Sequence, residues 1–294
     1  MSHAARSPLA GYMFLLPWLI GFLGLTLGPT LYSLYLSFTS YNLLSPPVWV
    51  GLENYVRLFT ADAKFWASMR VTFVFVILSV PLKLSFALAI AILLDRGIRG
   101  LPVYRAIFYL PSLLGGSVAI AILWRQIFGR NGVLNLVLAQ FGIEGASWIS
   151  DPRYSLLTLV ALAVWQFGSP MIIFLAGLRQ IPTDMYEAAS MDGASRRRIF
   201  FLITLPLLTP VIFFNFVIQT IDAFKAFTPA FIVSNGTGGP ANSTLFYTLY
   251  LYQEAFGNFR MGYAAALAWV LLVIIALFTA FAFLTSRFWV HYDE

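Results

Sequence analysis

The chain has 294 residues, of which 60% are hydrophobic and only 10% charged, and its mean hydropathy is +0.82. Soluble domains carry roughly 25% charged residues, so this composition excludes a soluble globular protein and indicates an integral membrane protein. The absence of cysteine excludes disulfides and thiolate metal sites, and two histidines, His3 and His291, are too few for a histidine metal cluster. Basic residues that flank membrane spans explain the net charge of +6, so we expect no nucleic-acid partner.

Long apolar runs without charge recur along the chain. The first has no charged residue between Ser7 and Leu52, which is too long for a signal-peptide core, so we expect an uncleaved span. A spanning helix needs about 20 apolar residues, and strand-like alternation is absent. The sequence therefore predicts an all-α integral membrane protein that forms one domain over residues 1–294. Its six transmembrane helices are expected at about 12–38, 67–94, 103–124, 154–178, 199–227 and 261–286.

The segments between the spans predict how the chain sits in the membrane. Six spans place both termini on one side, and the loops on that side are short and dense in arginine, which favours the cytoplasm. On the other side, residues 51–59 follow Pro46-Pro47 and place Leu52, Val56 and Phe59 on one helical face. This spacing predicts a helix that lies along the membrane surface.

The longest polar segment between spans, residues 182–198, has the order helix, break, helix. Pro182 suits a first helical position, and acidic residues in the next turns favour a helix start near Thr183. Gly193 follows about two turns later, where it can take positive φ and end the helix, and Ser195 can cap the next one. Ala188 and Ala189 leave a helical face without bulk. On composition alone, this segment could equally be an ordinary connection between two membrane helices. Arg196, Arg197 and Arg198 beside a helix N-terminus oppose its dipole, so we expect them to face membrane lipid headgroups or, less favoured, an acidic partner surface.

The amino-acid sequence of this segment resembles that of a known protein family. Glu187-Ala188-Ala189, then Asp192-Gly193, then an apolar run that ends in Leu205-Pro206 closely resemble the EAA loop of bacterial ABC importer membrane subunits, in the version found in sugar importers. Residues 51–59, 244–263 and 287–292 continue the likeness. The resemblance implies the transmembrane domain of a type I ABC importer, in which residues 179–206 form a cytoplasmic loop. Five residues of this loop would dock onto a separate ATPase subunit: Glu187, Ala188, Ala189, Asp192 and Gly193.

The resemblance also implies partners and a location. They are a second related permease, two ATPase subunits, an extracytoplasmic solute-binding protein and a carbohydrate substrate, in a bacterial cytoplasmic (inner) membrane. The chain has no Gly-x-x-x-x-Gly-Lys-Ser/Thr phosphate loop, and its lysines, Lys64, Lys83 and Lys225, lack that context. We therefore expect ATP and Mg²⁺ to bind to partner subunits, and this chain to be neither an enzyme nor the carrier of a cofactor.

Two predicted spans carry ionisable side chains at depth. An ionisable group costs about 2.5 to 3.5 kcal/mol at the centre of a membrane helix, so it usually lines a cavity or is paired. Asn215, Gln219, Asp222 and Lys225 recur at helical spacing, which predicts a stripe that faces a water-filled pathway. The alternative is a structural Asp222–Lys225 pair near the outer end of the helix. For Lys83, snorkelling or pairing with a neighbouring subunit is favoured over contact with substrate.

Trp165 and Gln166 are the other candidates for the pathway lining. An aromatic face stacks on the C–H surface of a sugar, and amides bind its hydroxyls. The family resemblance implies sugar contacts from the spans on either side of the polar loop, although a single tryptophan in a membrane helix also serves packing. The Asp222 and Lys225 charges exceed what a neutral sugar needs, which leaves an acidic or amino sugar open.

Two other classes of function compete with an importer subunit. In a self-contained secondary transporter, Asp222 and Lys225 would form a proton or sodium site. Internal inverted repeats would favour that class, and none is evident. A membrane-embedded enzyme would need a clustered acid, base or metal set, which the sequence lacks. The sequence does not indicate which sugar is carried.

Overall fold

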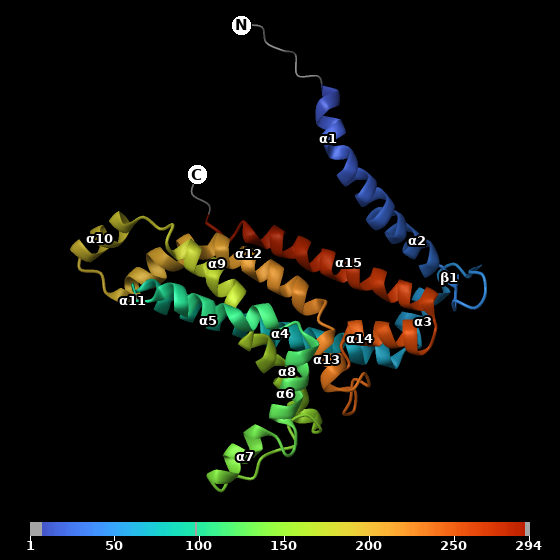
Figure 1. The fold of residues 1–294 in the computed structure, drawn as a ribbon. Coiled ribbons are helices and arrows are strands. Elements are labelled where there is room, and N and C mark those ends of the chain that lie inside the picture. Colours follow the sequence, from blue (N-terminus) through green and yellow to red (C-terminus); the bar gives the residue numbers. More distant parts are fainter. Residues whose placement is uncertain (1–7, 98, 292–294) are drawn as a thin grey trace. The chain divides into compact units, whose positions relative to one another are not determined.

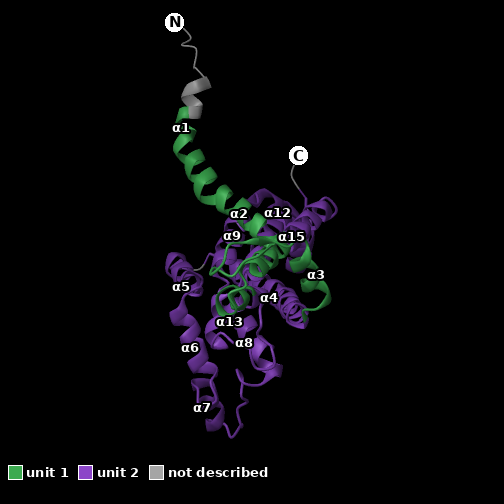
Figure 2. Cartoon of the chain, turned by 90° about the vertical axis from the view of Figure 1, so that its right-hand side faces the viewer, with its two compact units in different colours: residues 1–62, 251–272 green, residues 63–250, 273–294 purple. Residues whose placement is uncertain are grey.

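The computed structural model describes residues 8–97 and 99–291, so His3 lies outside the described residues. The described chain is mostly helical and divides into two compact units (Figure 2). Unit 1 comprises residues 1–62 and 251–272, and unit 2 comprises residues 63–250 and 273–294. Each unit is described by itself below.

Unit 1 begins with one apolar helix and a short hairpin. Its elements are α1 (Pro8–Gly21), the π-helical turn η1 (Phe22–Leu27), α2 (Gly28–Ser37), β1 (Thr39–Ser40), β2 (Val48–Trp49), α3 (Glu53–Thr60) and the π-helical turn η3 (Gln253–Gly257). The two strands are antiparallel, with Thr39 opposite Trp49. The helix predicted over residues 51–59 is α3. It buries Leu58 completely and exposes Leu52 and Val56 on its predicted apolar face.

Unit 2 holds most of the remaining helices. They are α4 (Ala63–Asp95), α5 (Leu101–Leu114), α6 (Val118–Phe128), α7 (Val133–Gln140), α8 (Pro152–Trp165), α9 (Gly168–Leu178), α10 (Thr183–Met191), α11 (Arg196–Ile199), the π-helical turn η2 (Phe200–Thr204), α12 (Leu205–Phe224) and α13 (Thr228–Val233). Two helices contribute to both units: α14 (Tyr247–Tyr252) and α15 (Met261–Ser286). Helices α10 and α11 lie at one end of α12, and α13 lies at its other end (Figure 1).

Helix α4 is the centre of unit 2 and packs against α8, α9 and α12 (Figure 1). Small residues on α4, such as Ser79, Ala87 and Ala91, are fully or almost fully buried, which lets helices approach closely where lipid gives no hydrophobic driving force. Aromatic pairs fill the wider gaps, for example Phe75 with Phe246 at 4.6 Å between ring centroids. The core therefore combines close helix contacts with aromatic packing.

The predicted membrane spans correspond to continuous helices and bent pairs. Among the described residues, four helices are long and apolar enough to cross a membrane, and the number is six if each of two bent pairs is one span. The predicted spans 103–124 and 154–178 are these pairs: α5 with α6–α7 bends by 95°, and α8 with α9 bends by 42°. The larger bend lies at Gly115-Gly116-Ser117, where the Ser117 side chain accepts from the Ile120 N–H and starts a new helix.

Prolines determine where other helices depart from regular α-helical hydrogen bonding. Pro170 has no N–H for the Gln166 carbonyl, and that carbonyl instead accepts from Ser112 Oγ on α5 at 3.0 Å. Two other prolines follow π-helical turns. One residue separates each turn from its proline: Gly28 lies between η1 and Pro29, and Leu205 lies between η2 and Pro206. In both cases the residue before proline donates to a carbonyl five residues back, so the helix continues past the proline.

The crossing of α5 and α9 depends on Gly168. A Cβ placed there would lie 2.4 Å from the Phe108 carbonyl oxygen and 2.7 Å from the Tyr109 Cα, both of which are backbone atoms that cannot rotate away. We expect Gly168→Ala to lower the midpoint of thermal unfolding, because overpacking costs about 1–3 kcal/mol.

Gly116→Ala is the matched control, because a Cβ at Gly116 would meet nothing within 4 Å. Both purified variants are unfolded by heat in detergent, and tryptophan fluorescence monitors the transition and gives the difference between their midpoints. Equal midpoints for the two variants would show that α5 and α9 do not cross as closely as the structure has them.

Candidate functional site

The polar segment between α9 and α12 folds as the local chemistry predicts, with one change. Helix α10 starts at Thr183, and Pro182 precedes it in extended conformation instead of forming its first residue. Gly193 has φ +73° and ends α10: its N–H donates to the Ser190 carbonyl, and the next N–H donates to the carbonyl of Ala189. The predicted cap is also present, since Ser195 Oγ accepts from the Arg198 N–H at 3.4 Å.

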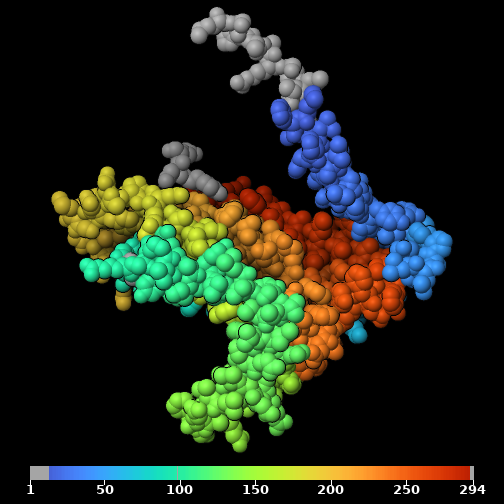
Figure 3. All heavy atoms as spheres, in the orientation of Figure 1, coloured from blue at the N-terminus to red at the C-terminus, as the bar shows by residue number. Residues whose placement is uncertain are grey.

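Helix α10 and its C-terminal turn present an open surface. Glu187, Ala188, Asp192 and Gly193 are exposed, and Ala189 is half-buried. Figure 3 shows this segment, in yellow, beside the start of α5 at one end of unit 2. Two methionines stand out from it, Met185 at 45% and Met191 at 89% exposure. Methionine is adaptable and common at binding surfaces, so the segment has the properties of a docking site.

A cavity of about 120 Å³ lies between α4, α8 and α12 in unit 2. Its polar lining consists of Ser79 and Lys83 from α4, Gln166 from the end of α8, and Gln219 and Asp222 from α12. Aromatic and aliphatic side chains, among them Phe75, Leu159 and Phe246, form the remaining walls. The mixture of amides, two opposite charges and apolar walls is suited to a polar solute that also has an apolar face.

The structure brings together three of the six side chains predicted to line a pathway, namely Gln166, Gln219 and Asp222. Trp165 instead packs against Trp124, with the rings tilted by 38° and 6.0 Å between their centroids. Asn215 is completely buried outside the cavity lining and donates to the Val211 carbonyl at 3.2 Å. Lys225 forms an ion pair with Asp222 at 3.4 Å, and both side chains are more than half exposed.

Lys83 is the lining residue to which sequence reasoning gave another role. The sequence favours snorkelling or pairing with a neighbouring subunit for Lys83, and the structure places it in the lining of the same cavity as Asp222. A lysine inside a long apolar helix was the available signal. Only the packing of α4 against α12 shows that it shares a cavity with Asp222 of another helix.

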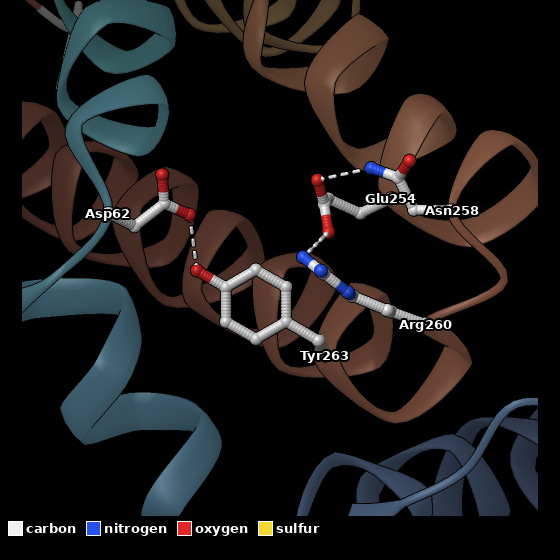
Figure 4. A network of polar contacts seen from close by, with 5 residues as sticks. All are labelled: Asp62, Glu254, Asn258, Arg260 and Tyr263. Carbon is white, nitrogen blue, oxygen red and sulfur yellow. Dashed lines mark hydrogen bonds and ion pairs between the residues drawn. The ribbon is translucent and has the colours of Figure 1, made fainter.

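Unit 1 contains a second polar site. Figure 4 shows the Tyr263 hydroxyl donating to the Asp62 carboxylate, and Glu254 accepting from Asn258 Nδ2 at 2.8 Å and pairing with Arg260 at 3.3 Å. The Glu254 side chain is only 5% exposed. Asp62 follows α3, and the other residues come from η3, the turn before α15 and its first turn, so the network connects the end of α3 to the entry of α15.

A basic pocket adjoins the network in unit 1. It has a volume of about 330 Å³ and is lined by Arg57, Asn258, Arg260 and Tyr263, among others. The Arg57 guanidinium lies 5.2 Å from the centroid of the Tyr263 ring. None of these residues was predicted as a site, because their proximity depends on contacts between α3 and the far end of the sequence.

These features define a membrane-spanning transport subunit, and comparison with known proteins identifies the family. Residues 15–289 match the family of binding-protein-dependent transport system inner membrane components. The chain belongs to this family and is therefore a permease subunit of the inner membrane.

Relatives cover nearly the whole chain. The probable ABC transporter permease YesP of Bacillus subtilis is 56% identical over 98% of this chain and 94% of its own length. The lactose transport permease LacF of Rhizobium radiobacter is 32% identical, and the coverage is 94% of each chain. The trehalose/maltose permease MalF of Thermococcus litoralis is 30% identical over 96% of this chain and 95% of its own length.

A solved structure confirms the fold. A chain of a bacterial alginate ABC transporter, solved in complex with a periplasmic protein that holds an alginate pentasaccharide, superposes with a TM-score of 0.81. The alignment covers 95% of this chain and 94% of that one, at 23% sequence identity. The prediction of an ABC importer transmembrane domain is thus confirmed.

The Glu254 network in unit 1 provides a test of stability. We expect Glu254→Ala to cost about 1–3 kcal/mol and to lower the unfolding midpoint, because it removes the acceptor of one hydrogen bond and one ion pair. Glu254→Gln should cost less, since its carbonyl can still accept from Asn258. The control is Glu144→Ala at an exposed loop glutamate, for which we expect no change. A midpoint for Glu254→Ala equal to that of the control would contradict the structural role of the network.

Proposed function

We propose that this chain carries a carbohydrate through the inner membrane as one of two related permeases in an ATP-driven importer. The names of the relatives support the substrate class, because LacF and MalF are permeases for lactose and for trehalose or maltose. A solute-binding protein would deliver the sugar from outside. Two ATPase subunits would bind ATP and Mg²⁺, and this chain would hold neither.

The observation that carries this proposal is the cavity between α4, α8 and α12. Gln166 and Gln219 offer donors and acceptors to sugar hydroxyls, and Phe75 and Phe246 offer aromatic surface to its C–H faces. Helices α8 and α12 lie on either side of the exposed α10 segment along the chain. The two glutamines of the lining and the docking segment therefore belong to one continuous stretch of the chain.

The size of the cavity supports a two-permease pathway. Ligand sites usually measure roughly 300–1,000 Å³, and this cavity holds about 120 Å³. The side chains of Asp222 and Lys225 are also 60% and 56% exposed. We infer that this chain supplies one wall of the site and that the second permease completes it.

The proposed topology follows from the docking role of α10. Glu187, Ala188, Ala189, Asp192 and Gly193 would contact an ATPase subunit, so residues 179–206 and both termini would be cytoplasmic. Helices α7 and α13 would then face the outside, where the solute-binding protein acts.

The rival function is a self-contained secondary transporter that uses Asp222 and Lys225. More than half of each side chain is exposed in this chain, whereas a coupling-ion site is shielded at the membrane midplane. Sugar uptake by this chain alone in proteoliposomes, driven by a proton or sodium gradient, would support the rival and overturn the importer.

The docking role of α10 can be tested by adding bulk to its exposed face. We expect Ala188→Trp to abolish the ATPase stimulation of the reconstituted importer by its sugar-loaded binding protein, because the partner could no longer approach closely. The side chain of Ala188 is exposed, so the chain itself should fold normally.

Ala276→Trp is the matched control, since Ala276 is an exposed alanine in the middle of the spanning helix α15, away from both the docking segment and the outer face. Its ATPase rate should equal that of the wild type. Full stimulation in Ala188→Trp would mean that α10 is only a connection between α9 and α12. A panel of neutral, acidic and amino sugars in the same assay would identify the substrate.

The cavity can be tested by removing one amide. Gln219→Leu keeps the approximate volume but leaves a sugar hydroxyl without its partner, which costs about 1–3 kcal/mol. We expect the KM for sugar uptake to rise roughly tenfold or more, with little change in the maximal ATPase rate. Gln140→Leu changes an exposed glutamine of α7 and should leave KM unaltered. An unchanged KM in Gln219→Leu would remove this residue from the sugar site.

A further inference from the structure

A second cavity of unit 2 lies behind the docking segment. It has a volume of about 500 Å³, and its lining includes Asp95 and Arg96 at the end of α4, Tyr186 of α10, Arg196 and Arg197 of α11, and Phe201 of η2. Figures 1 and 3 show the α10–α11 segment beside the start of α5, which follows the end of α4. Nothing in the importer function described above uses this cavity.

The lining carries an excess of positive charge. Its carboxylate, Asp95, is engaged elsewhere, since the Arg179 guanidinium lies 3.6 Å from it. In the part of the chain that the structure describes, Arg96, Arg196 and Arg197 form no ion pair. Three guanidinium groups around one space repel each other, so an anion in the cavity would be strongly favoured.

These arginines are not needed to build the segment that carries them. Helix α10 ends through backbone hydrogen bonds at Gly193, and the next helix is capped by the Ser195 hydroxyl. Cations in the first turn of a helix oppose its dipole, so Arg196 and Arg197 do not stabilise α11 locally. Their function must therefore lie in contacts outside the chain.

The surface next to the arginines is apolar. Phe201 and Leu202 lie one helical turn further along the chain and are 61% and 63% exposed. Guanidinium groups are the preferred ligands of phosphate oxygens because they donate two parallel hydrogen bonds, and exposed apolar side chains of a membrane protein lie against acyl chains. A phosphate joined to hydrocarbon satisfies both requirements.

We propose that this cavity binds the headgroup phosphate of an anionic phospholipid, with Arg96, Arg196 and Arg197 around the phosphate and Phe201 against an acyl chain. The same phosphate chemistry could be supplied by a soluble phosphate, but the exposed Phe201 and Leu202 favour the lipid.

The bound lipid would stabilise the docking segment. Tyr186 of α10 lines the cavity, and its hydroxyl lies 3.2 Å from Thr204 Oγ1 of η2. A lipid in contact with this wall would reduce the mobility of α10, so the ATPase rate should depend on anionic lipid. This consequence rests on the proposed docking role of α10, whereas the lipid site itself does not.

The test compares Arg196→Gln/Arg197→Gln with Arg99→Gln/Arg198→Gln. Both double variants remove two positive charges from the segments that follow α4 and α10, and Arg99 and Arg198 are exposed and outside the cavity lining. Each importer is purified through a tag on this chain from membranes with phosphatidylglycerol, and native mass spectrometry counts the lipid retained. We expect the wild type and the control to retain phosphatidylglycerol, and the cavity variant to retain at least tenfold less.

Equal retention in the two variants would overturn the lipid site. In a second arm, inorganic phosphate is added to the delipidated wild type, and its thermal midpoint is compared with that after phosphatidylglycerol is added. If only inorganic phosphate raises the thermal midpoint, the cavity binds a soluble phosphate and the lipid proposal is wrong. If only phosphatidylglycerol raises the midpoint, the lipid proposal is supported. If the wild type retains lipid but its sugar does not stimulate the ATPase, the result contradicts the proposed importer function and still supports the lipid site.

Discussion

A proline inside a membrane helix leaves one carbonyl oxygen without its N–H donor, and the hydrocarbon core offers no water to replace it. This constraint determines much of the local structure here. Before Pro29 and Pro206 the helix widens into a π-helical turn and then continues. Before Pro170 it bends, and the freed carbonyl of Gln166 accepts from Ser112 Oγ of another helix. The repair at Pro170 joins α8, α9 and α5 at one point.

The bend at Pro170 also places part of the candidate sugar site. Ser112 Oγ accepts from the Ser169 N–H as well as donating to the Gln166 carbonyl, so one hydroxyl connects both sides of the break. The Gln166 amide donates to the carbonyl of Gly115, where the other bent pair breaks. Its side chain is thereby held at the cavity by two irregular backbone positions. Breaks in a helix are costly in lipid because they leave backbone groups without partners. Here the breaks at Pro170 and at Gly115 hold the polar side chain of Gln166 in place.

The local features could be predicted from the sequence, and the cavity could not. Gly193 and Ser195 act through their own backbone conformation and hydroxyl, so a few neighbouring residues were enough to predict them. Membership of the cavity depends on packing between helices. Lys83 lies 139 positions before Asp222 in the chain, and helical spacing along α12 alone could not tell that Gln219 lines the space while Asn215 packs outside it.

Helix α12 connects α10 to the candidate sugar site. Helix α12 connects η2, which contacts Tyr186 of α10 through Thr204, to Gln219 and Asp222 in the cavity. A Cβ on Gly177 of α9 would lie 2.8 Å from Val211 Cγ2 of α12, so these two helices touch closely and would move together. The distance along α12 from Leu205 to Asp222 is about 26 Å at 1.5 Å per residue. A rotation of η2 that α12 follows rigidly would displace Asp222, whereas flexing at the π-helical turn before Pro206 would absorb the same rotation.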